Sequence, residues 1–167
     1  MFKKIIIFSL LGLLLILGVQ NCLADISVPR RDYAIGWQVS GPASGFCLKI
    51  PYQVDYYIQP IFTISMSEKD AATTGNYALG IRGIFDLPQH QDFLPYAGVA
   101  LGYSESYTRT TDSSSSNGNF GYEAFFGVEY QKYLLRPSLE IGIGGSNKND
   151  GSFHAGVICN LSVLYYF

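Results

Sequence analysis

Apolar and mixed positions alternate along the end of the chain. Every second residue from Val157 to Phe167 is apolar, whereas Asn160 and Ser162 fall on the other parity. A period of two is typical of a β-strand with one apolar face and one mixed face. The sequence therefore predicts an all-β chain of eight strands, because seven more segments of this kind precede the last one, at 33–40, 45–50, 55–66, 77–87, 93–104, 119–131 and 134–145.

The charges inside these segments indicate what each face of a strand meets. All of them lie on the parity opposite to the aliphatic row: Lys49, Asp55, Arg82, Asp86, Glu123, Glu129, Arg136 and Glu140. A charge at the middle of a bilayer costs roughly 2 to 4 kcal/mol, so we expect the aliphatic face to meet lipid and the charged face to line an interior. Because only helices and closed barrels satisfy their backbone groups in lipid, we expect an antiparallel, up-and-down transmembrane barrel.

The links between the strands differ in length and composition. Two polar links are long, 67–76 and 105–118, and both are predicted to be loops without strand structure. They follow odd-numbered strands, whereas the links after even-numbered strands are short. Bacterial barrels place short turns in the periplasm and longer loops outside the cell. We therefore expect both loops on the outer surface, where an extracellular partner would bind.

Two strand features depart from the regular pattern. Pro60 lies inside its segment and has no N–H group to donate, so we expect a bulge or a distortion there. The first two segments are shorter than the roughly 9 to 11 residues of a spanning strand, and we expect them to continue through residues 41–44.

The N-terminal residues have the organisation of a secretory signal. Lys3 and Lys4 precede an apolar run at 5–18, and small residues stand at Cys22 and Ala24. The run is shorter than the roughly 20 residues that a spanning helix needs. We therefore predict a signal peptide at 1–24, cleaved after Ala24, and a single domain at 25–167.

Composition and charge narrow the classes of function. With Lys3 and Lys4 removed, 9 of the 11 basic residues remain against 13 acidic ones, which is a net charge of −4. The chain thus lacks the basic patch that nucleic-acid binding requires. Tyrosine and phenylalanine are abundant, with 13 and 11 residues, and those on the aliphatic face fall near the two ends of the strands. Aromatic girdles of this kind are typical of the two membrane interfaces.

Two motifs resemble those of a known family. Residues 95–103, PYAGVALGY, look like its recurring central strand, and the chain ends on Tyr165-Tyr166-Phe167. Together with the signal and the eight segments, they make the chain similar to small outer-membrane barrels of the OmpA/OmpX-like, porin-family type. The resemblance implies a location in the outer membrane of a Gram-negative bacterium, in contact with its lipids. It also implies that Val163, Tyr165 and Phe167 form a signal read by the barrel-insertion machinery.

The charges on the interior face allow two interpretations. They could line a conducting channel, or they could pair across the lumen and fill it. An eight-stranded barrel has an interior just wide enough for side chains, which favours a filled lumen. The residues of this predicted lumen charge network are Lys49, Arg82, Asp86, Glu123, Glu129, Arg136 and Glu140.

Few residues suggest other chemistry. Ser152 and His154 share one face, and a hydrolase could use such a pair as nucleophile and base. Their order is reversed relative to the His-x-Ser of outer-membrane lipid A deacylases, and no carboxylate lies at an obvious neighbouring position, so we assign no catalytic residue. We expect a structural or surface-interaction barrel, with a lipid-modifying enzyme and a narrow channel as alternatives.

The cysteines and histidines do not suggest a disulfide or a cofactor. Cys47 and Cys159 lie on opposite parities, whereas a disulfide needs Cβ atoms within about 4.5 Å of each other. We therefore expect free, buried thiols. His90 lies in a predicted turn without a cysteine or a second histidine nearby, so we expect no metal site and no cofactor.

Overall fold

The described part of the chain forms a closed barrel in a computed structural model that covers residues 33–69, 72–110, 113–149 and 151–167. The predicted signal peptide at 1–24 lies outside these ranges. The strands are β1 (Ala34–Val39), β2 (Gly45–Gln53), β3 (Tyr56–Lys69), β4 (Ala72–Asp86), β5 (Phe93–Arg109), β6 (Ser114–Tyr130), β7 (Leu135–Lys148) and β8 (Phe153–Tyr166).

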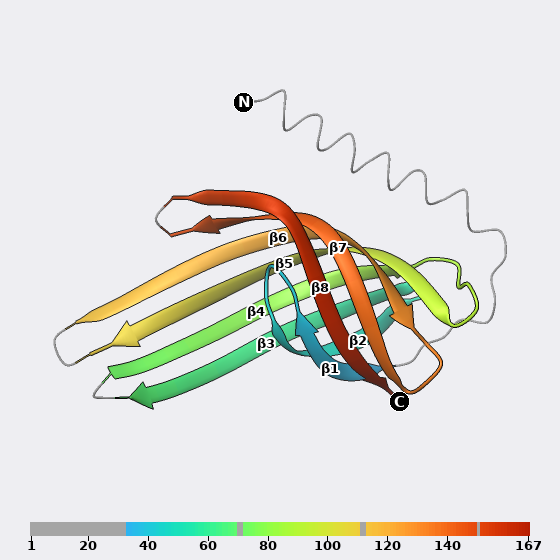
Figure 1. Cartoon of the computed structure of the whole chain (residues 1–167), viewed down its shortest axis with the longest axis horizontal. Helices are drawn as coiled ribbons and strands as arrows, with labels where there is room; N and C mark the ends of the chain where they lie inside the picture. Colours follow the sequence, from blue (N-terminus) through green and yellow to red (C-terminus); the bar gives the residue numbers. More distant parts are fainter. Residues whose placement is uncertain (1–32, 70–71, 111–112, 150) are drawn as a thin grey trace, which may run out of the picture.

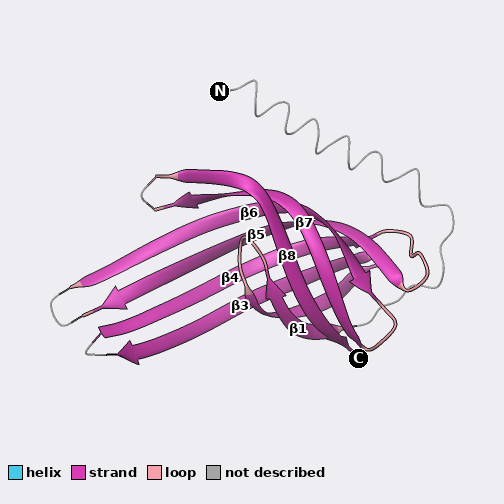
Figure 2. Ribbon diagram, in the orientation of Figure 1, coloured by secondary structure: helices cyan, strands magenta, loops and turns pink. Residues whose placement is uncertain are grey.

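Each strand pairs antiparallel with the next one along the chain, and β1 pairs with β8 to close the sheet (Figures 1 and 2). The predicted eight-stranded, up-and-down, antiparallel barrel is confirmed. Within the described ranges, no helix is long and apolar enough to cross a membrane.

Side chains alternate between the two faces of the wall as a period of two requires. On β7, Leu139 and Ile141 are 62% and 57% exposed on the outside, whereas Arg136 and Glu140 are 8% and 2% exposed on the inside. The same alternation runs along β6 from Gly121 to Glu129. The core of this protein is therefore the lumen, and its outer surface is apolar.

Two hairpins are longer than the sequence predicts. The segments 67–76 and 105–118 were expected to be loops, but β3 continues to Lys69 and β5 continues to Arg109, each paired with the following strand. This expectation was wrong because a polar composition does not prevent strand pairing. Once a ladder is in register, each further residue pair adds backbone hydrogen bonds, and polar side chains suit a hairpin that is solvated on both faces.

β1 is shorter than its predicted segment, 33–40, whereas β2 extends to Gln53, beyond the predicted 45–50. They do not continue through residues 41–44, because the segment Ser40–Ser44, called here the inner loop, folds into the lumen. Its Pro42 and Ala43 are buried. The inner loop is closed on itself by hydrogen bonds from Ser40 Oγ to the Ala43 carbonyl at 2.5 Å and from the Ser40 amide to Ser44 Oγ at 3.1 Å. Pro42 has no N–H group to donate to a ladder, which disfavours strand continuation at this point.

Glycines on the facing strands make room for the inner loop. Gly80, Gly102 and Gly121 are cross-strand neighbours on β4, β5 and β6, and together they form what we call the glycine shelf. A Cβ atom on Gly102 would lie 2.8 Å from the Pro42 carbonyl oxygen, and one on Gly80 would lie 2.8 Å from the Cβ atom of Ala43. Both distances are too short, so the shelf requires residues without side chains.

The disturbance expected at Pro60 is a gap in the ladder and not a bulge. Pairing between β2 and β3 includes Cys47 with Ile61 but skips the residues opposite Pro60 and Gln59, and it resumes at Ile50 with an unchanged offset. The register of this strand pair shifts further along, between Pro51 and Gln53.

Adding a methyl group to the glycine shelf should destabilise the barrel. We expect Gly102→Ala to cost about 1 to 3 kcal/mol of unfolding free energy, because the inner loop must move or strain to accommodate the new atom. The matched control is Gly83→Ala, where nothing lies within 4 Å of the added atom. Urea titrations of the folded barrel measure both values. Equal midpoints for the two variants would contradict the proposed packing of the inner loop.

Candidate functional site

The structure brings the predicted lumen charges together. All seven side chains point into the barrel and none is more than 8% exposed: Lys49, Arg82, Asp86, Glu123, Glu129, Arg136 and Glu140. They come from β2, β4, β6 and β7, and they form two neighbouring clusters.

The first cluster is built around Glu140. Its Oε2 atom lies 2.7 Å from Nη2 of Arg82, and Asn160 donates a hydrogen bond of 2.9 Å to the same oxygen. Oε1 accepts a 2.7 Å hydrogen bond from the hydroxyl group of Tyr96. Gln38 adds a further donor at 3.3 Å. The carboxylate thus has donors on both oxygens, which is what a buried charge requires.

Glu123 extends the first cluster towards the inner loop. Asn160 donates a 2.7 Å hydrogen bond to Glu123 Oε1, so this one amide bridges Glu123 and Glu140. The other oxygen of Glu123 faces the inner loop, since a Cβ atom on Gly41 would lie 3.5 Å from it. The inner loop therefore covers the charged cluster from one end of the barrel.

The second cluster is built around Glu129. Its Oε2 atom lies 3.6 Å from Lys49 Nζ and accepts a 2.6 Å hydrogen bond from the Tyr166 hydroxyl group. Lys49 in turn donates a 2.9 Å hydrogen bond to Tyr166 and lies 3.8 Å from Asp86 Oδ1. Arg136 Nη1 lies 3.5 Å from the other oxygen of Glu129. Hydrogen bonds to charged groups are stronger than those between neutral groups, and the residues of this cluster are buried.

Aromatic rings fill the space beside the cations. Lys49 Nζ lies 4.4 Å from the centre of the Tyr57 ring, and the Arg82 guanidinium lies 4.1 Å from the centre of the Phe125 ring. Tyr96, between them, packs edge-on against Phe125. Ring faces attract cations, so these contacts hold the charged groups in place while excluding water.

Several polar members of the clusters were missed by sequence reasoning. Gln38, Gln59, Asn160 and Tyr166 are all buried and hydrogen bonded to the charged residues. They lie on the same strand parity as the charged residues, and this parity could have predicted that they point into the lumen. The inner loop had no comparable signal in its own sequence.

The other candidate residues lie away from this site. Val163, Tyr165 and Phe167 face outward at the end of β8, and Phe167 stacks on Tyr33 with 6.4 Å between ring centres. Cys47 and Cys159 are free thiols, as expected. Cys47 is buried, but the expectation of burial was wrong for Cys159, which is exposed because it lies on the outward parity of β8.

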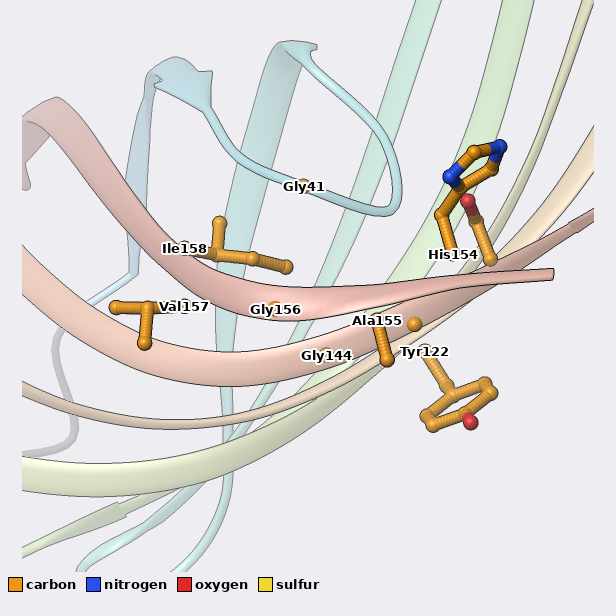
Figure 3. A pocket seen from close by; sticks show the side chains of 10 residues that line it. Gly41, Tyr122, Gly144, His154, Ala155, Gly156, Val157 and Ile158 are labelled. Atoms are coloured by element: carbon orange, nitrogen blue, oxygen red, sulfur yellow. The ribbon is translucent and has the colours of Figure 1, made fainter.

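Ser152 and His154 lie at the start of β8. His154 is exposed and projects to the same side of β8 as Gly41 of the inner loop (Figure 3). Among the described residues, no hydrogen bond or ion pair joins His154 to a carboxylate. In the same part of the chain, no group of three or more His, Cys, Asp or Glu side chains is placed to hold a metal ion.

Comparison with known proteins gives matches only among solved structures. No family model matches the chain, and no curated protein matches it. The chain is similar to Neisserial surface protein A, with 17% identity, a TM-score of 0.45 and coverage of 81% of this chain and 92% of that one. It is also similar to the N-terminal β-barrel domain of Pseudomonas aeruginosa OprF, with 12% identity, a TM-score of 0.48 and coverage of 81% and 96%.

A third match is Ail, the attachment invasion locus protein of Yersinia pestis, with 13% identity, a TM-score of 0.43 and coverage of 81% of this chain and 94% of that one. At identities of 12 to 17% and TM-scores of 0.43 to 0.48, these matches carry no argument about the role of this chain.

Removing the carboxylate of Glu140 should be among the most costly single changes in the lumen. We expect Glu140→Leu to lower the unfolding free energy by about 3 to 5 kcal/mol, because Arg82 is left as a buried charge without its partner. Replacing both residues, as Arg82→Met with Glu140→Leu, should restore most of that loss.

The control for these two variants is Glu68→Gln, which changes an exposed carboxylate on β3. Urea titration of the folded barrel, followed by its altered gel mobility, gives the unfolding free energy of the unchanged protein, the single variant, the double variant and the control. If Glu140→Leu were as stable as Glu68→Gln, the cluster would not hold the barrel together.

Proposed function

We propose that this chain is an outer-membrane barrel of a Gram-negative bacterium, with a filled lumen and a structural or surface-interaction role. The observation that carries the proposal is the apolar outer wall. Outward aliphatic side chains such as Leu79, Val99, Leu139 and Val157 are 65%, 61%, 62% and 71% exposed. Soluble proteins rarely expose a contiguous apolar surface of this extent, whereas a lipid bilayer would cover it.

Aromatic side chains at two levels support a membrane location. We call the ring at the barrel end where Tyr33 and Phe167 lie the terminal girdle: Tyr33, Tyr56, Phe93, Tyr165 and Phe167. The ring nearer the long hairpins is the hairpin girdle: Tyr77, Phe120 and Phe153. Aromatic girdles of this kind mark the two interfaces of an outer-membrane barrel.

The filled lumen favours a structural or interaction role over conduction. Two clusters of paired charges, aromatic rings and the inner loop occupy the interior. Any partner would then bind at the outer surface, where the β3–β4 and β5–β6 hairpins carry the polar residues 67–76 and 105–118. We also propose that Val163, Tyr165 and Phe167 serve as the signal for the barrel-insertion machinery, because they form an outward apolar row at the end of the chain.

A charge placed on the outer wall tests the membrane location. We expect Leu139→Arg to cost roughly 2 to 4 kcal/mol of folding free energy in phospholipid bilayers, because the new charge faces hydrocarbon at mid-depth. The control is Ser106→Arg, at an exposed position of the β5–β6 hairpin. Folding titrations into vesicles give both values. Equal costs would show that lipid does not surround β7.

Conductance measurements test the filled lumen. We expect the purified barrel to give no discrete current steps in planar bilayers, because the paired charges and the inner loop leave no continuous water path. Recordings across a range of voltages, with a known porin as the positive control, check this. Regular current steps from the folded protein would replace the structural role with a channel.

A further inference from the structure

The barrel wall is incomplete on one side. β1 pairs with β8 only between Leu161 and Tyr166, and the pairing of β2 with β3 ends at Phe62. Beyond these points, in the described part of the chain, residues 153–160 of β8 pair with β7 alone and residues 63–69 of β3 pair with β4 alone. Figure 1 shows β1 and β2 ending well short of the far ends of β3 and β8. We call the resulting opening the notch.

The notch lies at the depth of the apolar wall. Ile64 and Met66 on β3 and Val157 on β8 flank it, and they are 77%, 73% and 71% exposed on the outer face. Met66 and Val157 lie within about ten residues of the terminal-girdle residues Tyr56 and Tyr165, which is the length of a spanning strand. The notch therefore opens into the outer half of the bilayer that the proposed function assigns to this barrel.

Bare hydrocarbon cannot fill the notch by itself. The two strand edges that border it carry backbone N–H and C=O groups without a strand partner, and each such group costs several kcal/mol in lipid. The inside of the notch is polar above the inner loop, with Thr63 and Ser65 on β3 and His154 on β8. An occupant must therefore carry hydrogen-bonding groups for the strand edges and these polar side chains, together with an apolar part.

A pocket of about 210 Å³ lies beside β8, and its lining includes Gly41, His154 and Ile158. Gly144 on β7 and Gly156 on β8, which are cross-strand partners, also line it. Figure 3 shows Ile158 on the interior side, facing Gly41 of the inner loop, and Val157 on the opposite, outer side.

We propose that the notch is a lateral portal that admits the acyl chain of an outer-leaflet amphiphile. The chain passes between β3 and β8 and rests on Ile158 and the inner loop, and the polar head group stays with the hydrogen-bonding strand edges. The glycine shelf and the charged clusters close the path towards the terminal girdle. This proposal rests on the proposed membrane location, and it adds a ligand class to a barrel whose lumen is otherwise filled.

Tryptophan fluorescence tests the portal, because the chain has one native tryptophan, Trp37. On a Trp37→Phe background, Ile158→Trp places a probe inside the portal. Val157→Trp places one on the outer wall, and Ser104→Trp places one on the inner face of β5, away from the notch. Each protein is reconstituted in phosphatidylcholine vesicles whose acyl chains carry bromine, a short-range quencher.

An acyl chain in the portal should quench Ile158→Trp as strongly as Val157→Trp and leave Ser104→Trp bright. If Ile158→Trp stays bright while Val157→Trp is quenched, the portal does not admit lipid and the proposal is overturned. If all three stay bright, the barrel is not in the bilayer and the proposed function fails instead. Gel mobility with and without heating confirms folding, and Ser65→Trp reads the portal from the β3 edge if Ile158→Trp does not fold.

Discussion

Ionised side chains that are removed from water need partners, and in this protein that requirement fixes which way β2, β4, β6 and β7 face. Glu140 is 2% exposed, and its two oxygens accept hydrogen bonds from Arg82, Tyr96 and Asn160. A register slip of one residue would turn these groups towards the outer wall and bring aliphatic side chains inside. The closed barrel is the arrangement in which the charged row is paired inside and the aliphatic row faces outward.

The lumen is filled by two different means. Near the terminal girdle, charged and aromatic side chains occupy it. Nearer the long hairpins, backbone takes their place, because the inner loop lies on a shelf of glycines at Gly80, Gly102 and Gly121. The loop is inside the barrel because β1 and β2 are short, and their shortness also leaves the wall open beside β8. The filling of the lumen and the lateral notch are thus two consequences of one short hairpin.

The sequence predicted the features that depend on the two-residue period within each strand. Eight strands and the inward direction of residues such as Glu123 and Arg136 follow from a repeat of two that each segment carries by itself. Strand ends in the polar hairpins were missed, because pairing continues beyond the apolar span, where polarity no longer distinguishes strand from loop. The inner loop was missed for another reason. The loop packs on glycines that are cross-strand neighbours on three strands. The register that brings these glycines together cannot be read from the sequence of any one strand.

The alternation of side chains across the wall is the central claim, and a spin-label scan along β7 in bilayers tests it most directly. Nitroxides are placed one at a time from residue 137 to 143, and their collision rates with oxygen, which concentrates in lipid, are measured by power saturation. The claim predicts high rates at Leu139, Ile141 and Ile143 and low rates at Ser138, Glu140 and Gly142. A flat profile, or one of the opposite phase, would contradict it.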